Sequence, residues 1–356
     1  MRALVLTGGG ALGAYEAGVI CGLAETGQHF DLVCGTSIGA INAAFYAQGL
    51  IEELEGLWKT IAGKNIVTLS PTAQRVMDFV SELEAVLKLN PALWAFHVLG
   101  LIKKYKAMGP LPELMAMLGA LDRSPVTALL QPVLNFDNIR CSLVVTGTNV
   151  NLQTSESFFA FAAPAGGTPT AVDLQKAFLA NAKSAHPITA ENYLVAVEAS
   201  GSLPFAFPPM SENLGSSTTY LYVDGGVANN SPIGLAINAG ATDITVIFMT
   251  PASNAPLAAV PNVAVLGLAC YTVMQQKILE DDMKLALMTN QAVAGRTAAN
   301  DKLGLQGKVE VSLRQVRPVQ PLALSVLGFN DQPAIDEAFE LGRSDAKGVK
   351  TVWERA

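Results

Sequence analysis

The sequence predicts an α/β fold in which helices cover a parallel sheet, and three observations lead to this class. The chain opens with two short apolar runs, and each is followed by glycines and then by a helical pattern. Short apolar runs recur later, separated by further helical patterns. Half of the 356 residues are hydrophobic and 15% are charged, so the chain has ample apolar surface to form a large core.

The first two strand–helix units are the clearest part of this pattern. Ala3–Thr7 is a short apolar run, as expected for a buried parallel strand, and Ala14–Glu25 has helical character that stops at Gly27. Phe30–Cys34 repeats the strand signal, and Ile38–Gln48 predicts a helix of small residues. The order strand–helix–strand–helix indicates a parallel sheet with helical cover.

Residues 51–135 have a different character. Prolines separate four helical patterns, at Glu52–Trp58, Arg75–Leu89, Ala92–Lys106 and Glu113–Leu121. We therefore predict a helical insertion after the second strand–helix unit. Two roles fit it equally: plain cover for the sheet, or a cap over an active site.

The rest of the chain returns to alternating strands and helices. Apolar runs predict strands at Cys141–Thr146, Glu156–Phe161, Tyr220–Val223, Ile244–Thr250 and Val309–Gln315. Helical patterns occupy Gln175–Ala182, Glu191–Ala199, Val265–Met288 and 333–347. No change in composition marks a boundary, so we predict a single domain over residues 1–356 that includes the insertion at about 51–135.

Charge and ligand spacing exclude several functions. The net charge is −7 and no stripe of Lys and Arg stands out, which disfavours a nucleic-acid partner. Cys21, Cys34, Cys141 and Cys270 lack metal-site spacing, and we interpret them as buried thiols. No cluster of histidines and carboxylates has ligand spacing, so we expect neither a metal nor a cofactor.

The apolar runs are short throughout. The first one is too short for a signal peptide, and the longest ones fall short of a bilayer span. We therefore expect a cytoplasmic protein, with export by a route that leaves no cleavable signal as the alternative.

The first glycine-rich site is Gly8-Gly9-Gly10-Ala11-Leu12-Gly13, directly after the first predicted strand. Backbone N–H groups at such a turn hold negative charge, whether that of a pyrophosphate or of an oxyanion. The spacing of the glycines also fits the dinucleotide fingerprint. However, Asp31 stands at the start of the second strand, where it would not reach a ribose. The loop predicts an anion site without specifying the anion.

The second site is Gly35-Thr36-Ser37-Ile38-Gly39, where a buried strand turns into a helix. This is the context of a nucleophile elbow, a sharp turn that presents the hydroxyl of Ser37 above the sheet. Gly35 and Gly39 are needed because side chains there would collide with the neighbouring strand and helix. The alternative is an idle serine at a glycine-tolerant turn.

A nucleophilic serine needs a base, and the histidines are poorly placed to supply one. His29 is at a turn, His97 is in an apolar helix, and His186 precedes a proline in a polar loop. No histidine follows His186, so a triad in the order Ser, acid, His is excluded. A carboxylate must therefore be the base if Ser37 is a nucleophile.

The third site, Asp224-Gly225-Gly226, supplies such a carboxylate at the end of an apolar strand. An Asp at the carboxyl end of a central strand lies where open α/β sheets place their reacting groups. Gly225 and Gly226 let the backbone turn sharply and keep the carboxylate accessible. Taken alone, the site also fits a plain Asp-Gly turn.

Together and in this order, the three sites resemble the patatin-like phospholipase family. The family has a glycine-rich oxyanion loop, an elbow and an Asp-Gly motif, which correspond to Gly8–Gly13, Gly35–Gly39 and Asp224–Gly226. Flanking residues 199–209 and 227–232 extend the resemblance. It implies a three-layer α/β/α fold with a mostly parallel central sheet.

The resemblance also implies a serine–aspartate dyad that hydrolyses carboxylic esters of lipids or other acyl compounds. Ser37 would be the nucleophile and Asp224 the general base. The oxyanion would be held by four backbone N–H groups, those of Gly8, Gly9, Gly10 and Ile38. The implied partners are a lipid or ester substrate and, transiently, a membrane or micelle surface.

Leu12 departs from the family pattern, which usually has Arg or Lys before the last glycine of the loop. A cation is therefore missing near the oxyanion loop, and we expect a less charged ester or lipid to be accepted more easily than a phospholipid. In the insertion, four apolar side chains could form an acyl-binding wall or pack as ordinary core: Leu93, Trp94, Phe96 and Leu99.

Two other functions remain open at this point. A non-catalytic storage or interaction protein of the same fold predicts no acyl-enzyme and no effect of replacing Ser37 or Asp224. A dinucleotide-binding oxidoreductase that uses Gly8–Gly13 is less favoured, and it predicts retention on a nucleotide affinity resin.

Overall fold

The structure, a computed structural model, describes residues 1–70, 73–74, 78, 81–82, 104, 121–164, 167–204, 206–215, 217–252, 263–295 and 307–355. Within these residues, ten strands form one sheet, in which the order β10-β9-β8-β1-β2-β3-β4-β5 is extended by β7 on β3 and β6 on β7. The five central strands are β1 (Arg2–Leu6), β2 (Leu32–Gly35), β3 (Ser142–Asn149), β8 (Asp243–Ile247) and β9 (Ser312–Val316).

These five strands are all parallel to one another. Every antiparallel pair in the described sheet involves at least one outer strand: β3 pairs with β4 and β7, β6 with β7, and β9 with β10. The outer strands are β4 (Thr154–Ala160), β5 (Ala185–Pro187), β6 (Met210–Glu212), β7 (Tyr220–Asp224) and β10 (Lys350–Trp353). The carboxyl ends of the central strands therefore meet at one edge of the sheet.

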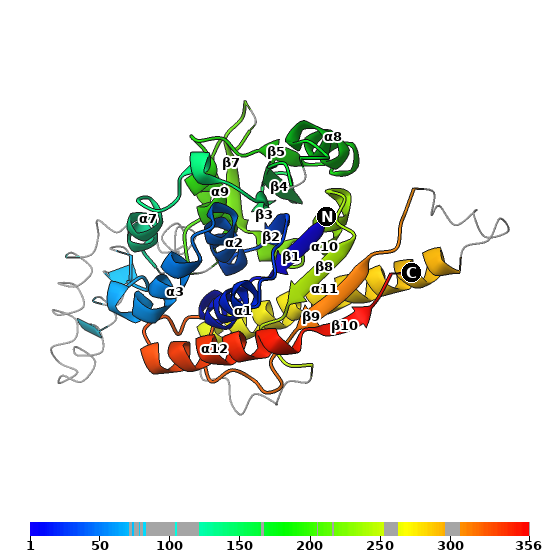
Figure 1. The fold of residues 1–356 in the computed structure, drawn as a ribbon. Coiled ribbons are helices and arrows are strands. Elements are labelled where there is room, and N and C mark those ends of the chain that lie inside the picture. The colour runs from blue at the N-terminus through cyan, green and yellow to red at the C-terminus, as the bar shows by residue number, and fades with distance from the viewer. Residues whose placement is uncertain are drawn as a thin grey trace.

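Helices cover both faces of the sheet (Figure 1). One face packs against α1 (Gly13–Glu25), α2 (Ile38–Gln48), α3 (Ile51–Thr60), α7 (Ser124–Leu130), α9 (Tyr193–Ser200) and α12 (Gln332–Asp345). The other packs against α8 (Ala171–Asn181), α10 (Ile233–Asn238) and α11 (Val263–Ala294). Short 3₁₀ helices are η1 (Gly10–Leu12), η2 (Ile61–Lys64), η5 (Phe136–Asn138), η6 (Gly225–Val227) and η8 (Ala346–Gly348).

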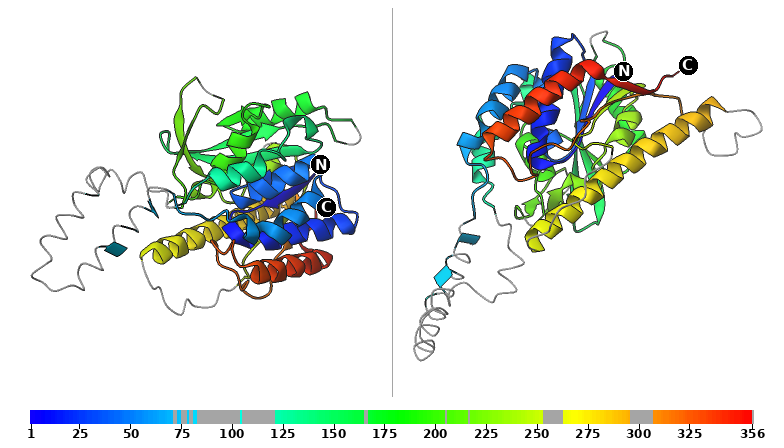
Figure 2. Two further views of the ribbon diagram at one scale, coloured as in Figure 1. Left: turned by 90° about the vertical axis from the view of Figure 1, so that its left-hand side faces the viewer. Right: turned by 90° about the horizontal axis from the view of Figure 1, so that it is seen from below.

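The alternation of side chains along β1 explains the two cores. Leu4 and Leu6 pack in the core with α1 and α2, whereas Ala3 and Val5 pack in the core with α10 and α11. Both sets are fully buried, as in a strand that is covered on both faces. The three-layer α/β/α arrangement follows, with α11 and α12 on opposite sides of the sheet (Figure 2).

Helices α1 and α12 approach each other backbone to backbone. A Cβ atom on Gly18 would lie 1.9 Å from the carbonyl oxygen of Phe339, and one on Gly342 would lie 2.0 Å from that of Tyr15. Arg343 of α12 also forms an ion pair with Glu25 at 3.0 Å. The C-terminal helix is thus packed tightly on the helix that follows the first glycine-rich loop.

Most predicted elements have counterparts in the structure, including the two opening strand–helix units. Besides the 3₁₀ helices, three strands and two α-helices were not predicted from the sequence: β5, β6, β10, α7 and α10. Each is eight residues long or shorter, so its periodicity is too brief to recognise. Of the predicted insertion, α3 and α7 are described, whereas the expected helices at 75–89, 92–106 and 113–121 lie essentially outside the described residues.

The interpretation of the cysteines needs one correction. Cys21 and Cys34 are buried and Cys141 is partly buried, but Cys270 is exposed, and all four are free thiols. Cys270 lies on α11, which covers the sheet with one face and leaves its other faces accessible. In the part of the chain that the structure describes, no helix is both long enough and apolar enough to cross a membrane.

Candidate active site

The first two glycine-rich motifs come together because their strands are parallel neighbours. Leu6 at the end of β1 is in register with Gly35 at the end of β2. Both strands therefore deliver their following turns, Gly8–Gly13 and Gly35–Gly39, to the same edge of the sheet. Each turn then leads directly into a helix, α1 or α2.

Ser37 has the backbone conformation of a sharp strand-to-helix turn. Its φ of 58° and ψ of −128° lie in a region that residues with a side chain rarely adopt, and α2 begins at the next residue. A Cβ on Gly35 would lie 2.3 Å from the carbonyl oxygen of Gly39, and one on Gly39 would lie 2.7 Å from that of Thr7. The two glycines therefore permit the close approach that the turn requires.

Asp224 reaches the same edge from the opposite direction. Its strand, β7, runs antiparallel to β3, and Asp224 is in register with Gly147. The expectation that Asp224 ends a central strand is thus wrong, because β7 is an outer strand that pairs with the part of β3 beyond its parallel pairing with β2. The Thr148 hydroxyl donates to the Asp224 carbonyl oxygen at 2.9 Å and helps to fix its backbone.

The side chains of Ser37 and Asp224 are in direct contact. The Ser37 hydroxyl donates to Asp224 Oδ2 at 2.5 Å, and the Gly226 N–H donates to Asp224 Oδ1 at 2.7 Å. The Asp224 side chain is fully buried, and this burial raises its pKa to about 6, although the hydrogen bonds from Ser37, Gly226 and Tyr271 lower it. The carboxylate is therefore a stronger base than an exposed aspartate.

The backbone N–H groups around Ser37 divide into two sets. The Gly8 N–H donates to Asn230 Oδ1 at 2.9 Å and is already paired. Among the described residues, no acceptor is present for the N–H groups of Gly9, Gly10 and Ile38. These three residues line the same pocket as Ser37, and the Ile38 N–H is at the N-terminus of α2. Three residues with a free backbone donor therefore line the pocket together with Ser37.

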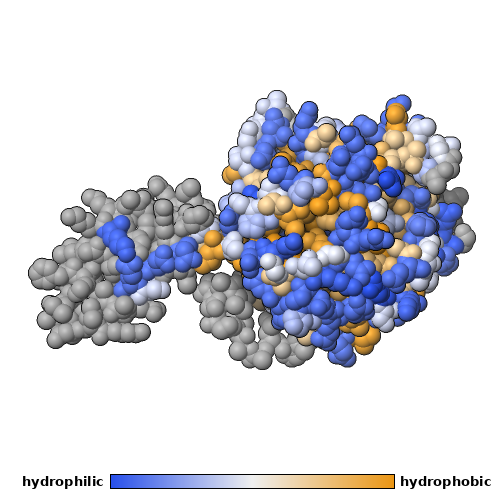
Figure 3. Space-filling view, turned by 60° about the vertical axis from the view of Figure 1, so that its left-hand side comes forward, coloured by the Kyte–Doolittle hydropathy of each residue, from blue (hydrophilic) through white to orange (hydrophobic). Residues whose placement is uncertain are grey.

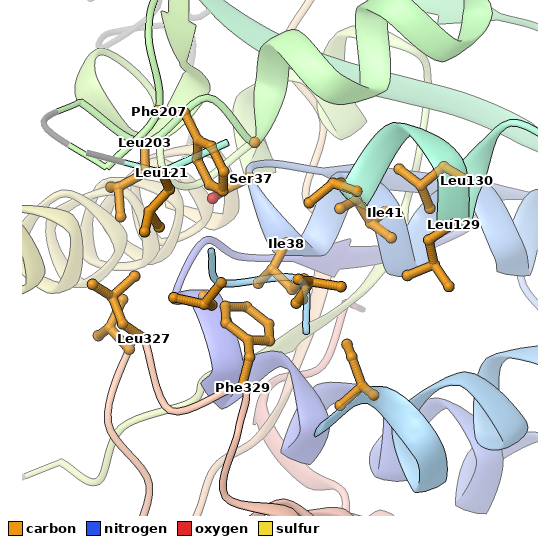
Figure 4. A pocket seen from close by; sticks show the side chains of 18 of the residues that line it. Ser37, Ile38, Ile41, Leu121, Leu129, Leu130, Leu203, Phe207, Leu327 and Phe329 are labelled. Carbon is orange, nitrogen blue, oxygen red and sulfur yellow. The ribbon is translucent and has the colours of Figure 1, made fainter. Parts of the chain in front are cut away.

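This pocket is strongly apolar (Figure 4). Its lining includes Ile38 and Ile41 of α2, Leu57 and Trp58 of α3, and Ile61, Ile66 and Val67. Among the described residues that line it, none is charged. The side of the molecule that carries α3 and α7 also shows hydrophobic side chains gathered between hydrophilic ones (Figure 3).

The rest of the pocket lining comes from segments that contain no recognised sequence motif. Leu121 and α7 contribute from the predicted insertion, and Val326, Leu327 and Phe329 contribute from the loop that follows β9. The described part of the insertion therefore lines the pocket as well as covering the sheet. The suggested wall of Leu93, Trp94, Phe96 and Leu99 lies outside the described residues.

His186 and Asp31, which the sequence analysis considered as a catalytic base and as a ribose ligand, lie away from Ser37. His186 stacks on Phe158 and has its Nε2 atom 3.5 Å from Glu156 Oε2. Asp31 accepts the Arg2 N–H at 2.8 Å, at the amino ends of β1 and β2 and so at the opposite edge from Gly8–Gly13. In the described residues, no group of three or more His, Cys, Asp or Glu side chains could hold a metal ion.

Several polar residues of the site carry no signal that local sequence patterns reveal. Ser200 Oγ accepts the Ser37 N–H at 2.9 Å, and Tyr271 and Gln275 reach the site from α11. Asn230 lies in the segment that follows the Asp-Gly motif, so the resemblance covered it without indicating its role. Tyr271 and Gln275 are four residues apart on a helix, and only this spacing places them on one face.

The fold and the site together define a class of three-layer α/β/α proteins that hold a serine and a buried aspartate beside an apolar pocket. The sequence model of the patatin-like phospholipases matches residues 4–237. Since this is more than half of the chain, the chain belongs to the patatin-like phospholipase family. The expected family and fold class are confirmed, and the family is one of hydrolases that act on ester bonds.

Individual relatives are more distant. Lysophospholipase nte1 from Aspergillus terreus is 47% identical over 62 residues, which are 17% of this chain and 4% of that protein. The chain thus corresponds to a small part of this relative. VipD from Legionella pneumophila aligns over 98% of this chain and 67% of that chain, with 15% identity and a TM-score of 0.39. A chain of the SpcU–ExoU complex from Pseudomonas aeruginosa aligns over 79% and 51%, with 16% identity and a TM-score of 0.25.

Proposed function

We propose that this protein is a serine acyl hydrolase that cleaves carboxylic esters of lipids through a covalent acyl-Ser37 intermediate. The observation that carries this proposal is the 2.5 Å contact between Ser37 Oγ and Asp224 Oδ2 at the wall of an apolar pocket. A buried carboxylate with a pKa raised to about 6 is ionised at neutral pH, yet binds a proton more readily than an exposed aspartate does.

In the acylation step, Asp224 takes the proton of Ser37 while Oγ attacks the ester carbonyl carbon. The carbonyl oxygen becomes an oxyanion, which the N–H groups of Gly9, Gly10 and Ile38 stabilise, at about 3–4 kcal/mol for a well-placed donor. The Gly8 N–H is left out of this set because Asn230 occupies it. Collapse of the tetrahedral intermediate expels the alcohol, which receives the proton from Asp224.

In the deacylation step, Asp224 takes a proton from a water molecule, and the resulting hydroxide attacks the acyl carbonyl carbon. The same three N–H groups stabilise the second oxyanion. Its collapse releases the carboxylic acid and returns the proton from Asp224 to Ser37. Both halves of the reaction therefore use one base and one set of donors.

The lining of the pocket favours an acyl chain over a charged group. Each buried methylene contributes about 0.8 kcal/mol, so a chain that enters the pocket gains affinity with length. The described lining holds no charge, and Leu12 stands in place of the family's usual cation. We therefore propose a lipid ester with an uncharged group next to the ester bond as the preferred substrate. Contact with a micelle or membrane surface and a cytoplasmic location stay predictions.

The proposal is tested by intact mass after incubation with a fluorophosphonate probe, which reacts with activated serines. We expect one adduct on the wild type, none on Ser37→Ala and slow labelling of Asp224→Asn. Ser142→Ala is a matched control, because Ser142 is buried at the start of β3 and its hydroxyl donates to the Ala162 carbonyl oxygen, away from the dyad.

The outcomes separate the alternatives. An adduct that persists in Ser37→Ala would identify a different nucleophile. A folded wild type that forms no adduct and hydrolyses no ester would point to a non-catalytic protein. A series of 4-nitrophenyl esters of increasing chain length, run on the wild type, then tests the acyl site.

A further inference from the structure

Tyr271 of α11 interacts directly with the Asp224 carboxylate. Its hydroxyl lies near the Asp224 carboxylate and interacts with its charge, and Tyr271 lines the pocket that contains Ser37. Burial and the nearby charge of Asp224 raise the pKa of Tyr271 far above its ordinary value, so the hydroxyl keeps its proton and acts as the donor. Tyr271 lies outside residues 4–237, the range of the family match.

A chain of hydrogen bonds fixes the orientation of this hydroxyl. Gln275 Nε2 donates to the Tyr271 hydroxyl oxygen at 2.8 Å. An amide nitrogen can only donate, so the tyrosine proton remains available for Asp224. The backbone carbonyl of Gln275 accepts from Asn230 Nδ2 at 3.2 Å, and Asn230 Oδ1 accepts the Gly8 N–H. The glycine-rich loop, α11 and Asp224 are thereby connected through polar groups.

The packing around Gly226 places the same groups independently. A Cβ atom on Gly226 would lie 2.9 Å from the Tyr271 hydroxyl oxygen and 2.1 Å from Gln275 Nε2. The Gly226 N–H is one of the donors to Asp224. The absence of a side chain at this position thus gives Tyr271 and Gln275 room beside the carboxylate.

We propose that Tyr271 is a positioning residue, which keeps Asp224 ionised beside Ser37, and that Gln275 orients the Tyr271 hydroxyl for this task. The inference rests on the proposed serine–aspartate dyad. The groups that interact with the carboxylate are the Ser37 hydroxyl, the Gly226 N–H and the Tyr271 hydroxyl, and no charged side chain of the described residues is among them. Removing Tyr271 therefore leaves two donors to stabilise the charge.

The experiment compares the pH dependence of kcat/KM for the wild type, Tyr271→Phe, Gln275→Met and Tyr193→Phe. The substrate is 4-nitrophenyl butanoate, read at the isosbestic wavelength so that product ionisation does not interfere. Tyr193 is the matched control, because it is buried and its hydroxyl donates to the Ala44 carbonyl oxygen, away from the dyad. Thermal unfolding verifies that each variant is folded.

In the pH profile of kcat/KM, the acid limb is the part in which activity falls as the pH decreases. We expect this limb to move to higher pH by about one unit in Tyr271→Phe, since one unit corresponds to about 1.4 kcal/mol of preference for the charged form of Asp224. Activity then falls about tenfold on the acid side and stays close to the wild type above pH 8. Gln275→Met shifts the limb in the same direction by less, because the hydroxyl remains but is no longer oriented. Tyr193→Phe leaves the limb in place.

An acid limb of Tyr271→Phe that coincides with those of the wild type and Tyr193→Phe would overturn the inference while leaving the dyad intact. A uniform loss of activity at every pH would do the same, because it would indicate a structural role. Failure of the dyad itself gives a different result, since the wild type would then neither hydrolyse the ester nor react with the fluorophosphonate. If Tyr271→Phe does not fold, the shift in Gln275→Met decides the question.

Discussion

The backbone N–H of Ala11 donates to the carbonyl oxygen of Val326 at 2.8 Å. This bond attaches the glycine-rich loop after β1 to the loop that follows β9, which lies outside the range of the family match. Val326 also lines the pocket beside Gly9 and Gly10. The free N–H groups of this loop are therefore held in place by a segment that the family motifs do not include.

Gly10 should tolerate no side chain, whereas Gly9 should tolerate one. A Cβ on Gly10 would lie 2.2 Å from the Val326 carbonyl oxygen, and its φ of +59° disfavours residues with a side chain by about 1–2 kcal/mol. A Cβ on Gly9 would meet the flexible end of Met249 at 2.7 Å. We expect kcat to fall by about 10²–10³ in Gly10→Ala, the loss typical of one oxyanion donor, and by less than about tenfold in Gly9→Ala.

These kcat values are measured with a soluble ester, beside the rate of fluorophosphonate labelling. Thermal unfolding shows whether Gly10→Ala has lost only the donor geometry or the fold as well. Equal kcat values for folded Gly9→Ala and Gly10→Ala would contradict the assignment of Gly10 to the oxyanion site.

The activity should depend on the ionisation of Asp224. Burial raises the pKa of this carboxyl to about 6, and only its ionised form can take the proton of Ser37. We expect kcat/KM to be constant above about pH 7 and to fall about tenfold per unit well below pH 6. A profile measured from pH 4.5 to 8.5 checks this, and a limb near pH 4, the range of exposed aspartates, would argue against Asp224 as the base.

The residues that could be predicted from the sequence are those whose role depends on local backbone geometry. Ser37, Gly35 and Gly39 form one turn. Gly8–Gly13 lies beside this turn because β1 and β2 are parallel neighbours that end at the same edge of the sheet. The direction of β7 could not be predicted, because a strand's direction follows from the pairing partner and not from its own residues. Asp224 was identified by its motif, although the reason given for its position was wrong.

The features of the site that the sequence did not indicate are contacts between segments that lie far apart in the chain. The Gly8 N–H is taken by Asn230, 222 positions away, so one of the four expected oxyanion donors is already paired. Tyr271 and Val326 reach the site from α11 and from the loop after β9. Such pairings depend on how helices dock on the sheet, and no periodicity within a single segment encodes that docking.

The far part of the pocket should set the length of the acyl chain. Ile41 lies one turn after Ile38 on α2 and faces Leu129 and Leu130 of α7, away from Ser37 (Figure 4). A tryptophan at position 41 would fill this part. If it displaces about two methylenes at about 0.8 kcal/mol each, kcat/KM for long-chain esters falls about tenfold in Ile41→Trp.

Short-chain esters should be hydrolysed by Ile41→Trp at close to the wild-type rate, since they do not reach position 41. Leu179→Trp is the control, because Leu179 is exposed on α8, on the opposite face of the sheet. Parallel losses for short and long esters in Ile41→Trp would place the acyl chain elsewhere.

Glu16 should make folding stability depend on pH in a range where few other groups do. Its carboxylate is fully buried and accepts the Thr7 N–H at 2.8 Å and Asn42 Nδ2 at 2.8 Å, and burial raises its pKa to about 8. Because the folded state holds this proton more tightly than the unfolded state, the stabilisation is complete below the ordinary glutamate pKa and is lost as pH rises through about 8.

Between pH 6 and pH 8, this group alone should lower the free energy of unfolding by about 2 kcal/mol. Glu16→Gln removes the titration and should flatten the dependence by that amount, even though the amide cannot accept both hydrogen bonds and the variant is less stable at every pH. Urea denaturation at pH 6 and pH 8 gives the free energy of unfolding of the wild type and of Glu16→Gln. The slope of each protein is the change in this free energy between the two pH values. Comparing slopes cancels the contribution of Asp224, which both proteins retain. Identical slopes would mean that Glu16 is already ionised at pH 6 and that its two hydrogen bonds outweigh the cost of its burial.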